Sequence, residues 1–216
     1  MRIPSIPTRG RTLDYAASIY DLLEPVYLLN KQAEYDLTIL DILALQPTDK
    51  ILDIGCGTGV LCQMIAQQLQ PENGGTVTGI DAAGKMIEVA RKKRGSAHCL
   101  FEPMAAEELT FQDESFDGVV SSLFYHHVPL DLKKQSLTEA FRVLKPGGKL
   151  VIADMHTPTT FMGSLVSQVS RWFFMQPQIG ENIRGVLPGL IEEAGFQPPR
   201  TVAHYFGYIS VFETTK

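Results

Sequence analysis

The sequence predicts an α/β fold: a doubly wound, mostly parallel sheet of seven strands with helices on both faces. Two observations predict it. Short apolar runs, typical of buried strands, alternate with helix-compatible segments through five successive units. After the fifth unit, two apolar runs on either side of Gly207 fit a β-hairpin, which would add an antiparallel C-terminal strand.

The elements follow from where the apolar runs begin and end. Proline and glycine separate them, for example at Pro47, Gly74 and Gly195. Residues 1–12 contain two prolines and several charges, and we expect a loose arm there. The expected strands are 51–54, 76–80, 97–102, 115–123, 149–154, 201–206 and 208–212, and the expected helices are 14–29, 32–45, 60–69, 86–94, 131–144 and 181–194.

Composition and charge restrict the classes of function. The net charge of −5 argues against a nucleic-acid partner. No apolar run approaches the length of a bilayer-spanning helix, and the start of the chain lacks the apolar stretch of a signal peptide. Cys56, Cys62 and Cys99 have no metal-ligand spacing, so we expect reduced thiols and no metal. We expect a cytoplasmic monomer or homodimer without stable membrane insertion.

The stretch from Ile51 to Val60 organises the candidate site. An apolar run broken only by Asp53 leads into glycines at positions 55, 57 and 59. Glycine permits positive φ and a close approach of a ligand to the backbone. The third glycine comes one residue earlier than in the dinucleotide fingerprint G-x-G-x-x-G, and the Asp53 carboxylate would repel a pyrophosphate. The loop therefore suits a ligand with a nucleoside at one end and a positive charge at the other.

A second carboxylate, Asp81, ends the next predicted strand, 22 residues after Gly59. Doubly wound folds place an acidic residue at about this distance, where it accepts hydrogen bonds from ribose hydroxyls. S-adenosylmethionine carries both a ribose and positive charge, so it matches both carboxylates. We expect Asp53 and the loop 55–59 to hold the methionine part of this cofactor, and Asp81 to hold the ribose.

Five segments of the chain carry recognisable motifs: YDLLEPVY (20–27), DIGCGTG (53–59), GIDAAGKMIEVARKK (79–93), FDGVV (116–120) and RVLKPGG (142–148). Together they resemble the motifs of the class I S-adenosylmethionine-dependent methyltransferases. Specific motifs cover about residues 45–155, and the pattern looks most like the quinone-biosynthesis type and its small-molecule relatives. The resemblance implies a Rossmann-like fold with a terminal hairpin and S-adenosylmethionine as cofactor.

A single domain is expected over residues 1–216, because the chain is long enough for one core and shows no repeat or linker. Within it we expect an N-terminal helical lid (1–45) and a cofactor-binding core (46–155). A substrate-lid insertion (156–180) and a C-terminal helix with a hairpin (181–216) would follow.

The resemblance also implies a set of cofactor-binding residues. Ala105 stands where the family commonly has an acid that holds the adenine amino group, and Ala106 matches a small residue whose backbone meets the ring. A register shift that brings Glu107 into the role of the acid is the alternative. The small Cys56 is expected to fill the glycine loop rather than act as a nucleophile. The full set is Asp53, Gly55, Cys56, Gly57, Thr58, Gly59, Asp81, Ala82, Met86, Ala105, Ala106, Ser121 and Tyr20.

His126 and His127 follow the carboxyl end of the fourth predicted strand, where ligands bind in an open parallel sheet. They are candidates for the catalytic base that a phenol or an activated carbon acceptor needs. The implied reaction is methyl transfer to O, N or C of a small acceptor, aromatic or lipophilic. Two alternatives stay open. One is a cofactor-binding scaffold without catalysis, and the other is a nicotinamide-dependent oxidoreductase, which the glycine spacing disfavours.

Overall fold

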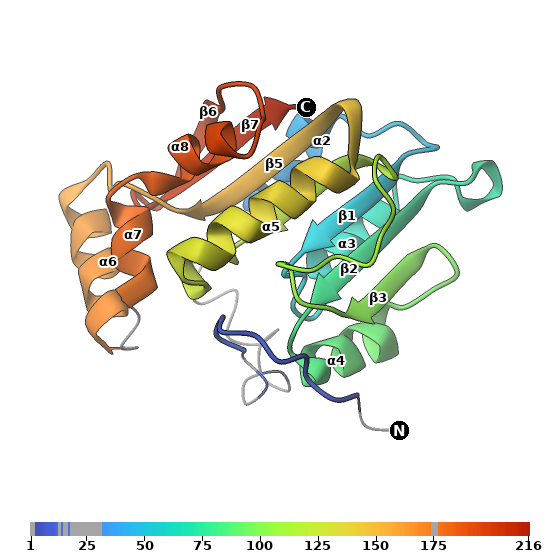
Figure 1. Ribbon diagram of the computed structural model, residues 1–216, viewed down its shortest axis with the longest axis horizontal. Helices are drawn as coiled ribbons and strands as arrows, with labels where there is room; N and C mark the ends of the chain where they lie inside the picture. The colour runs from blue at the N-terminus through green and yellow to red at the C-terminus, as the bar shows by residue number, and fades with distance from the viewer. Residues whose placement is uncertain (1–2, 13, 15–16, 18–31, 174–176) are drawn as a thin grey trace.

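The protein forms a seven-stranded sheet with helices on both faces, as predicted (Figure 1). The computed structural model describes residues 3–12, 14, 17, 32–173 and 177–216. The expected helix over 14–29 lies largely outside the described residues. The strands are β1 (Lys50–Ile54), β2 (Thr76–Asp81), β3 (Cys99–Pro103), β4 (Phe116–Ser122), β5 (Leu144–Met155), β6 (Arg200–Tyr205) and β7 (Ile209–Thr215).

The strand order is β3-β2-β1-β4-β5-β7-β6. Strands β1 to β3 are added toward one edge of the sheet, and from β4 onward strands are added on the other side of β1. All neighbouring pairs from β3 to β5 are parallel, while β7 pairs antiparallel with both β5 and β6. The predicted antiparallel strand therefore lies one position inside the sheet edge, and β6 forms the edge itself. The reversal between β1 and β4 creates a crevice at the carboxyl ends of these strands, which is where ligands bind in such sheets.

Two layers of helices cover the sheet. The helices are α2 (Gln32–Leu43), α3 (Val60–Ala66), α4 (Gly84–Arg94), α5 (Leu130–Val143), α6 (Phe161–Phe173), α7 (Pro177–Ile183) and α8 (Val186–Glu193), with short 3₁₀ turns η1 (Pro71–Asn73) and η2 (Tyr125–His127). Neighbouring strand residues divide between two cores: Ile51 packs with α2, α3 and α4, whereas Leu52 packs with α5 and α8. This alternation is the period-two pattern of strands buried on both faces.

Two local expectations were wrong. The predicted helix over 181–194 is broken at Gly185, which has a φ of 79° and separates α7 from α8. Pro188 falls in the first turn of α8, where proline is tolerated. The strand expected over 149–154 begins earlier, at Leu144 within RVLKPGG, as β5, and its register against β4 is irregular between Phe116 and Gly118.

The expected loose arm is in fact held against the body of the protein. We call residues 3–12 the N-terminal strap. Its backbone is fixed by hydrogen bonds from Ile6 N to Ala82 O (2.8 Å) and from Arg11 N to His127 O (3.1 Å). The strap thus runs from the carboxyl end of β2 to η2, across the crevice. Proline content predicted a lack of regular structure here, but these contacts to distant residues fix its position.

Candidate active site

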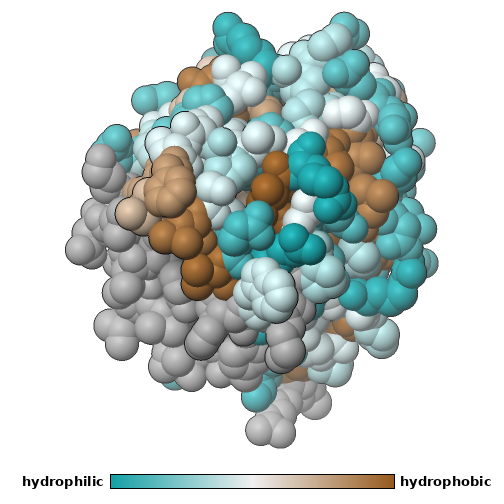
Figure 2. Space-filling view, turned by 90° about the vertical axis from the view of Figure 1, so that its left-hand side faces the viewer, coloured by the Kyte–Doolittle hydropathy of each residue, from teal (hydrophilic) through white to brown (hydrophobic). Residues whose placement is uncertain are grey.

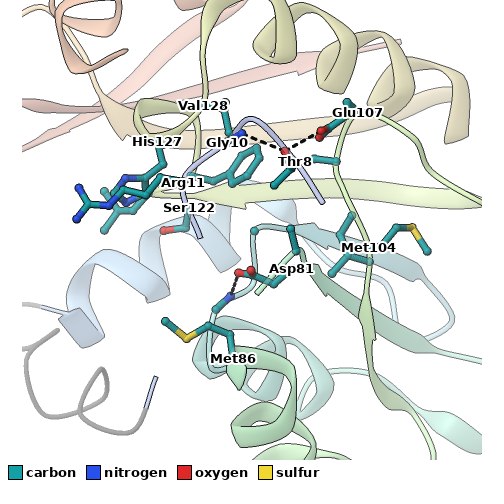
Figure 3. Close-up of a pocket in the computed structure, with 17 residues that line it drawn as sticks. Thr8, Gly10, Arg11, Asp81, Met86, Met104, Glu107, Ser122, His127 and Val128 are labelled. Atoms are coloured by element: carbon teal, nitrogen blue, oxygen red, sulfur yellow. Dashed lines mark hydrogen bonds between the residues drawn. The ribbon is translucent and has the colours of Figure 1, made fainter. Parts of the chain in front are cut away.

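A pocket lies at the carboxyl ends of β1, β2 and β4, beneath the N-terminal strap (Figure 3). Parallel strands end together at this edge, so residues far apart in sequence meet there. The strap, the glycine loop, the end of β2, the segment after β3 and the segment after β4 all contribute. The lining residues are Thr8, Gly10, Arg11, Gly55, Gly57, Ile80, Asp81, Ala82, Met86, Met104, Ala106, Glu107, Ser122, Leu123, Phe124, His127 and Val128.

The glycine loop needs its glycines for both conformation and space. Gly55, Gly57 and Gly59 all have positive φ, between 53° and 84°. A Cβ atom at Gly55 would lie 2.5 Å from the Phe124 ring, and one at Gly59 would lie 2.4 Å from the Phe101 ring. Such distances are impossible for a side chain without movement of the neighbouring ring. The positive φ is as the sequence predicted, but at Gly55 and Gly59 the space that a Cβ would need is occupied by aromatic rings of the protein rather than left for a ligand.

The amides of the loop are already used within the protein. Gly55 N and Cys56 N both donate to Ile80 O at 2.9 Å, and Gly59 N donates to Cys56 O at 2.9 Å. Gly57 N donates to Asp81 Oδ2 at 3.1 Å. A pyrophosphate site requires loop amides that point at the anion. Because these four are engaged, the loop suits a nucleoside without a pyrophosphate, which counts against the nicotinamide alternative.

Asp81 presents a fixed carboxylate to the pocket. Besides the bond from Gly57, its Oδ1 accepts a hydrogen bond from Ala83 N at 2.8 Å. Each carboxylate oxygen of Asp81 can accept a further hydrogen bond, so the two oxygens can together accept hydrogen bonds from both hydroxyls of a ribose. Burial raises the pKa of Asp81 to about 6, which the two backbone hydrogen bonds partly oppose. The residue is thus suited to the role predicted for it, binding the ribose of the cofactor.

Asp53 lies below the loop and is buried rather than in the pocket lining. Its Oδ2 accepts a hydrogen bond from the thiol of Cys62 at 3.1 Å. Burial raises its pKa to about 7, with a smaller contribution from the nearby Asp81 carboxylate. A neighbouring cation would favour its charged form. An effect of Asp53 on the ammonium group of a bound cofactor would therefore act through the loop.

The structure brings only part of the predicted set to the pocket. Gly55, Gly57, Asp81, Ala82, Met86, Ala106 and His127 line it. Cys56, Thr58 and Gly59 belong to the loop but do not line the pocket; Thr58 is buried and Cys56 packs against the core. Ala105 is buried next to the lining residues Met104 and Ala106. Cys56, Cys62 and Cys99 are free thiols, as expected. Tyr20 lies outside the described residues.

Two predicted residues point away from the pocket. Ser121 is buried and its hydroxyl donates to Ile54 O at 2.8 Å, while the next residue, Ser122, lines the pocket. His126 is also buried, with Nδ1 2.8 Å from Asp154 Oδ1. Its ring lies against that of His127, with centroids 3.9 Å apart. Of the two candidate bases, His127 lines the pocket and His126 does not, so the geometry favours His127 as the candidate.

A buried polar network holds η2 in place. Asp154, at the end of β5, accepts hydrogen bonds from Tyr125 N at 2.6 Å and from Asn182 Nδ2 at 3.3 Å, in addition to its contact with His126. Asn182 also donates to Met155 O at 3.1 Å. The network therefore joins β5, η2 and α7, and it fixes the backbone on which His127 is carried.

Sequence reasoning missed the contribution of the strap. Thr8, Gly10 and Arg11 all line the pocket, and Figure 3 shows Arg11 beside His127. Nothing in the local pattern marks these residues, because their positions depend on contacts with the segments after β3 and β4. Glu107, kept only as an alternative, also lines the pocket. The apolar residues Leu123, Phe124 and Val128 were near the predicted strand end but were not assigned to the site.

Comparisons with known proteins agree with this geometry. Residues 52–152 match the family model described as "Methyltransferase domain". The chain is 29% identical over 218 residues to the ubiquinone/menaquinone biosynthesis C-methyltransferase UbiE of Geobacter sp. (strain M21), with 91% of each chain covered. It is 33% identical over 142 residues to the demethylmenaquinone methyltransferase of Listeria welshimeri, covering 64% of this chain and 58% of that protein.

A solved structure shares the fold. Haemonchus contortus phosphoethanolamine N-methyltransferase 2, in complex with S-adenosyl-L-methionine, superposes with a TM-score of 0.65 at 20% sequence identity. The match covers 85% of this chain and 52% of that chain. It confirms the doubly wound fold predicted from the alternation of strands and helices.

Proposed function

Since the chain belongs to the class I S-adenosylmethionine-dependent methyltransferases, in the branch of the quinone-biosynthesis enzymes, we propose that it methylates a small aromatic and lipophilic acceptor. The predicted family, enzyme class and cofactor are confirmed: the protein is a methyltransferase that uses S-adenosylmethionine. The nature of the acceptor is our proposal. No observation on the described residues favours the alternative of an inactive scaffold.

The wall of the pocket after β4 carries the proposal. It combines the apolar side chains of Leu123, Phe124 and Val128 with a single imidazole, that of His127, and the hydroxyl of Ser122. Binding pockets with mainly apolar walls and few polar groups suit aromatic ligands, whose orientation the polar groups set. A quinol-type ring, with an apolar face and ionisable hydroxyls, fits this combination, and the names of the quinone-methylating relatives support the choice.

An exposed apolar helix face supports a lipophilic acceptor. On α6, Phe161 is 84% and Trp172 79% exposed, and Met162, Leu165 and Val169 are exposed beside them (Figure 2). Helix α6 packs on α7, which contacts η2, the turn that carries His127. An apolar tail on the acceptor could therefore lie along this face, in the segment 156–180 that we propose as the substrate lid. No helix among the described residues is long and apolar enough to span a bilayer.

The residues of the pocket suggest how methyl transfer would be assisted. Bound S-adenosylmethionine supplies a methyl group on a positively charged sulfur. His127 would accept the proton of an acceptor hydroxyl, which makes the ring more electron-rich at its hydroxyl oxygen and ring carbons. The apolar wall would hold the ring against the cofactor, and such positioning can lower the activation barrier by roughly 7–11 kcal/mol. The Asp154 network would keep His127 in place.

An acceptor panel tests this proposal. We expect the enzyme to methylate reduced naphthoquinones and substituted phenols in preference to primary amines, with S-adenosylhomocysteine formation as the readout.

We expect His127→Gln to lower kcat by about 10²- to 10⁴-fold, the usual range for a positioned acid–base group. Affinity for S-adenosylhomocysteine should not change. His98→Gln is the matched control, because His98 is half-buried just before β3 and does not line the pocket. Full activity of His127→Gln, or methylation of amines alone, would contradict the proposal.

A further inference from the structure

The pocket contains two carboxylates among its described lining residues, Asp81 and Glu107. Asp81 lies against the glycine loop and is bonded to the backbone at Gly57 and Ala83. Glu107 lies on the other side, after β3, next to the lining residues Met104 and Ala106 (Figure 3). The two carboxylates are thus separate, and each can bind a different donor of the same ligand.

The cofactor offers two kinds of donor to such groups. Its ribose carries a diol, which suits Asp81, and its adenine carries an exocyclic amine. Ile80, Met86, Met104 and Ala106 give the pocket an apolar lining that suits a flat ring. An amine buried against such a lining needs a hydrogen-bond acceptor, because an unpaired polar group away from water is costly. Glu107 is the lining carboxylate that follows Met104 and Ala106 in the chain.

The carboxylate of Glu107 is held by the N-terminal strap. Thr8 Oγ1 donates to Glu107 Oε1 at 2.7 Å and accepts a hydrogen bond from Gly10 N at 3.0 Å. The single proton of the hydroxyl is therefore directed at Glu107. Among the described residues this is the one hydrogen bond to the Glu107 side chain, so Oε2 can accept from a ligand. Ala105, where an acid was expected, offers no side-chain acceptor.

On the premise that S-adenosylmethionine binds this pocket, we propose that Glu107, positioned by Thr8, accepts the hydrogen bond of the adenine amine. The pair takes the place of an acid at position 105. Two segments nearly a hundred residues apart, the strap and the segment after β3, then recognise the base together. A consequence is that the choice of adenine depends on the strap lying in the place that the structure shows.

Calorimetric titration of the full chain with two ligands tests the proposal. One is S-adenosylhomocysteine, and the other is its 6-deamino analogue, which has hydrogen in place of the amine. A hydrogen bond to a charged group corresponds to about a 10- to 100-fold preference of the wild type for the first ligand. We expect Glu107→Ala to lose this preference by weakening binding of S-adenosylhomocysteine alone, and Thr8→Val to reduce the preference. Glu107→Gln, whose amide oxygen still accepts, should retain part of it.

The neighbouring Glu108 provides the matched control, because it is exposed and does not line the pocket. Glu108→Ala should keep the wild-type ratio of affinities. An unchanged ratio in folded Glu107→Ala and Glu107→Gln would overturn the assignment. Failure of the wild type to bind S-adenosylhomocysteine would instead contradict the cofactor assignment itself, so the two failures can be told apart. Because the readout is a ratio between two ligands, a general loss of stability cannot imitate the result.

Discussion

Asp81 and Asp53 are two buried carboxylates at the same loop, yet their surroundings give them different tasks. Asp81 is bonded to two backbone amides and faces the pocket, while Asp53 receives a thiol hydrogen bond and faces the core. Burial raises the pKa of both, to about 6 and about 7 respectively. Of the two carboxylates, only that of Asp81 is placed to accept hydrogen bonds from a ribose in the pocket. The difference arises from strand geometry, because Asp53 lies within β1 and Asp81 at the end of β2.

The raised pKa of Asp81 predicts that cofactor affinity depends on pH. If Asp81 binds the ribose as proposed, its carboxylate form would accept the ribose hydroxyls, whereas the protonated form would have lost one acceptor. This contribution is therefore present above pH 6 and is lost as the pH falls through 6. We expect the affinity for S-adenosylhomocysteine to fall by up to about tenfold between pH 6 and pH 5, measured by calorimetry. The Asp81→Asn variant should bind S-adenosylhomocysteine more weakly than the wild type at pH 8, and its affinity should not show this fall between pH 6 and pH 5. An identical pH dependence in Asp81→Asn would refute the assignment.

At the scale of elements, the N-terminal strap completes the site that the sheet begins. The sheet brings the loop, Asp81 and the segment after β4 together, but the strap supplies Thr8, Gly10 and Arg11. The strap has no helix or strand of its own, and its place depends on close contact with α4. A Cβ atom at Gly84, the first residue of α4, would lie 2.2 Å from Ile3 O. Because Gly84 has no side chain, the strap can pack directly against the start of α4.

Gly84→Ala is expected to displace the strap without unfolding the protein. The added methyl group conflicts with Ile3 O, whereas alanine is favourable within a helix. We expect faster tryptic cleavage at Arg9 and Arg11, measured by mass spectrometry, and weaker binding of S-adenosylhomocysteine. Gly189→Ala in α8 is the matched control, because nothing lies within 4 Å of the added carbon. It should leave both cleavage and binding unchanged. A strap equally protected in Gly84→Ala and wild type would show that Gly84 has no such role.

At the scale of the whole molecule, local patterns predicted the fold and part of the candidate site. The loop and Asp81 could be assigned to this candidate site because their residues are close in sequence, and Gly55, Gly57 and Asp81 do line the pocket. The direction in which individual side chains point was harder to predict from the sequence. A one-residue difference decides whether Ser121 or Ser122 reaches the pocket, since adjacent strand residues face opposite sides. The strap could not be predicted, because its contacts, such as Thr8 with Glu107, join residues 99 positions apart.

The acceptor remains the central proposal, and the fate of the methyl group tests it most directly. The purified protein would be incubated with S-adenosylmethionine carrying a ¹³C-labelled methyl group and with a reduced naphthoquinone that has an unsubstituted ring carbon. We predict a new ¹³C-methyl signal on the ring or on its hydroxyl oxygen, with an equal amount of S-adenosylhomocysteine, and a strong reduction in His127→Gln. Binding of the cofactor without transfer to this ring or to any phenol, while an aliphatic amine is methylated, would contradict the account.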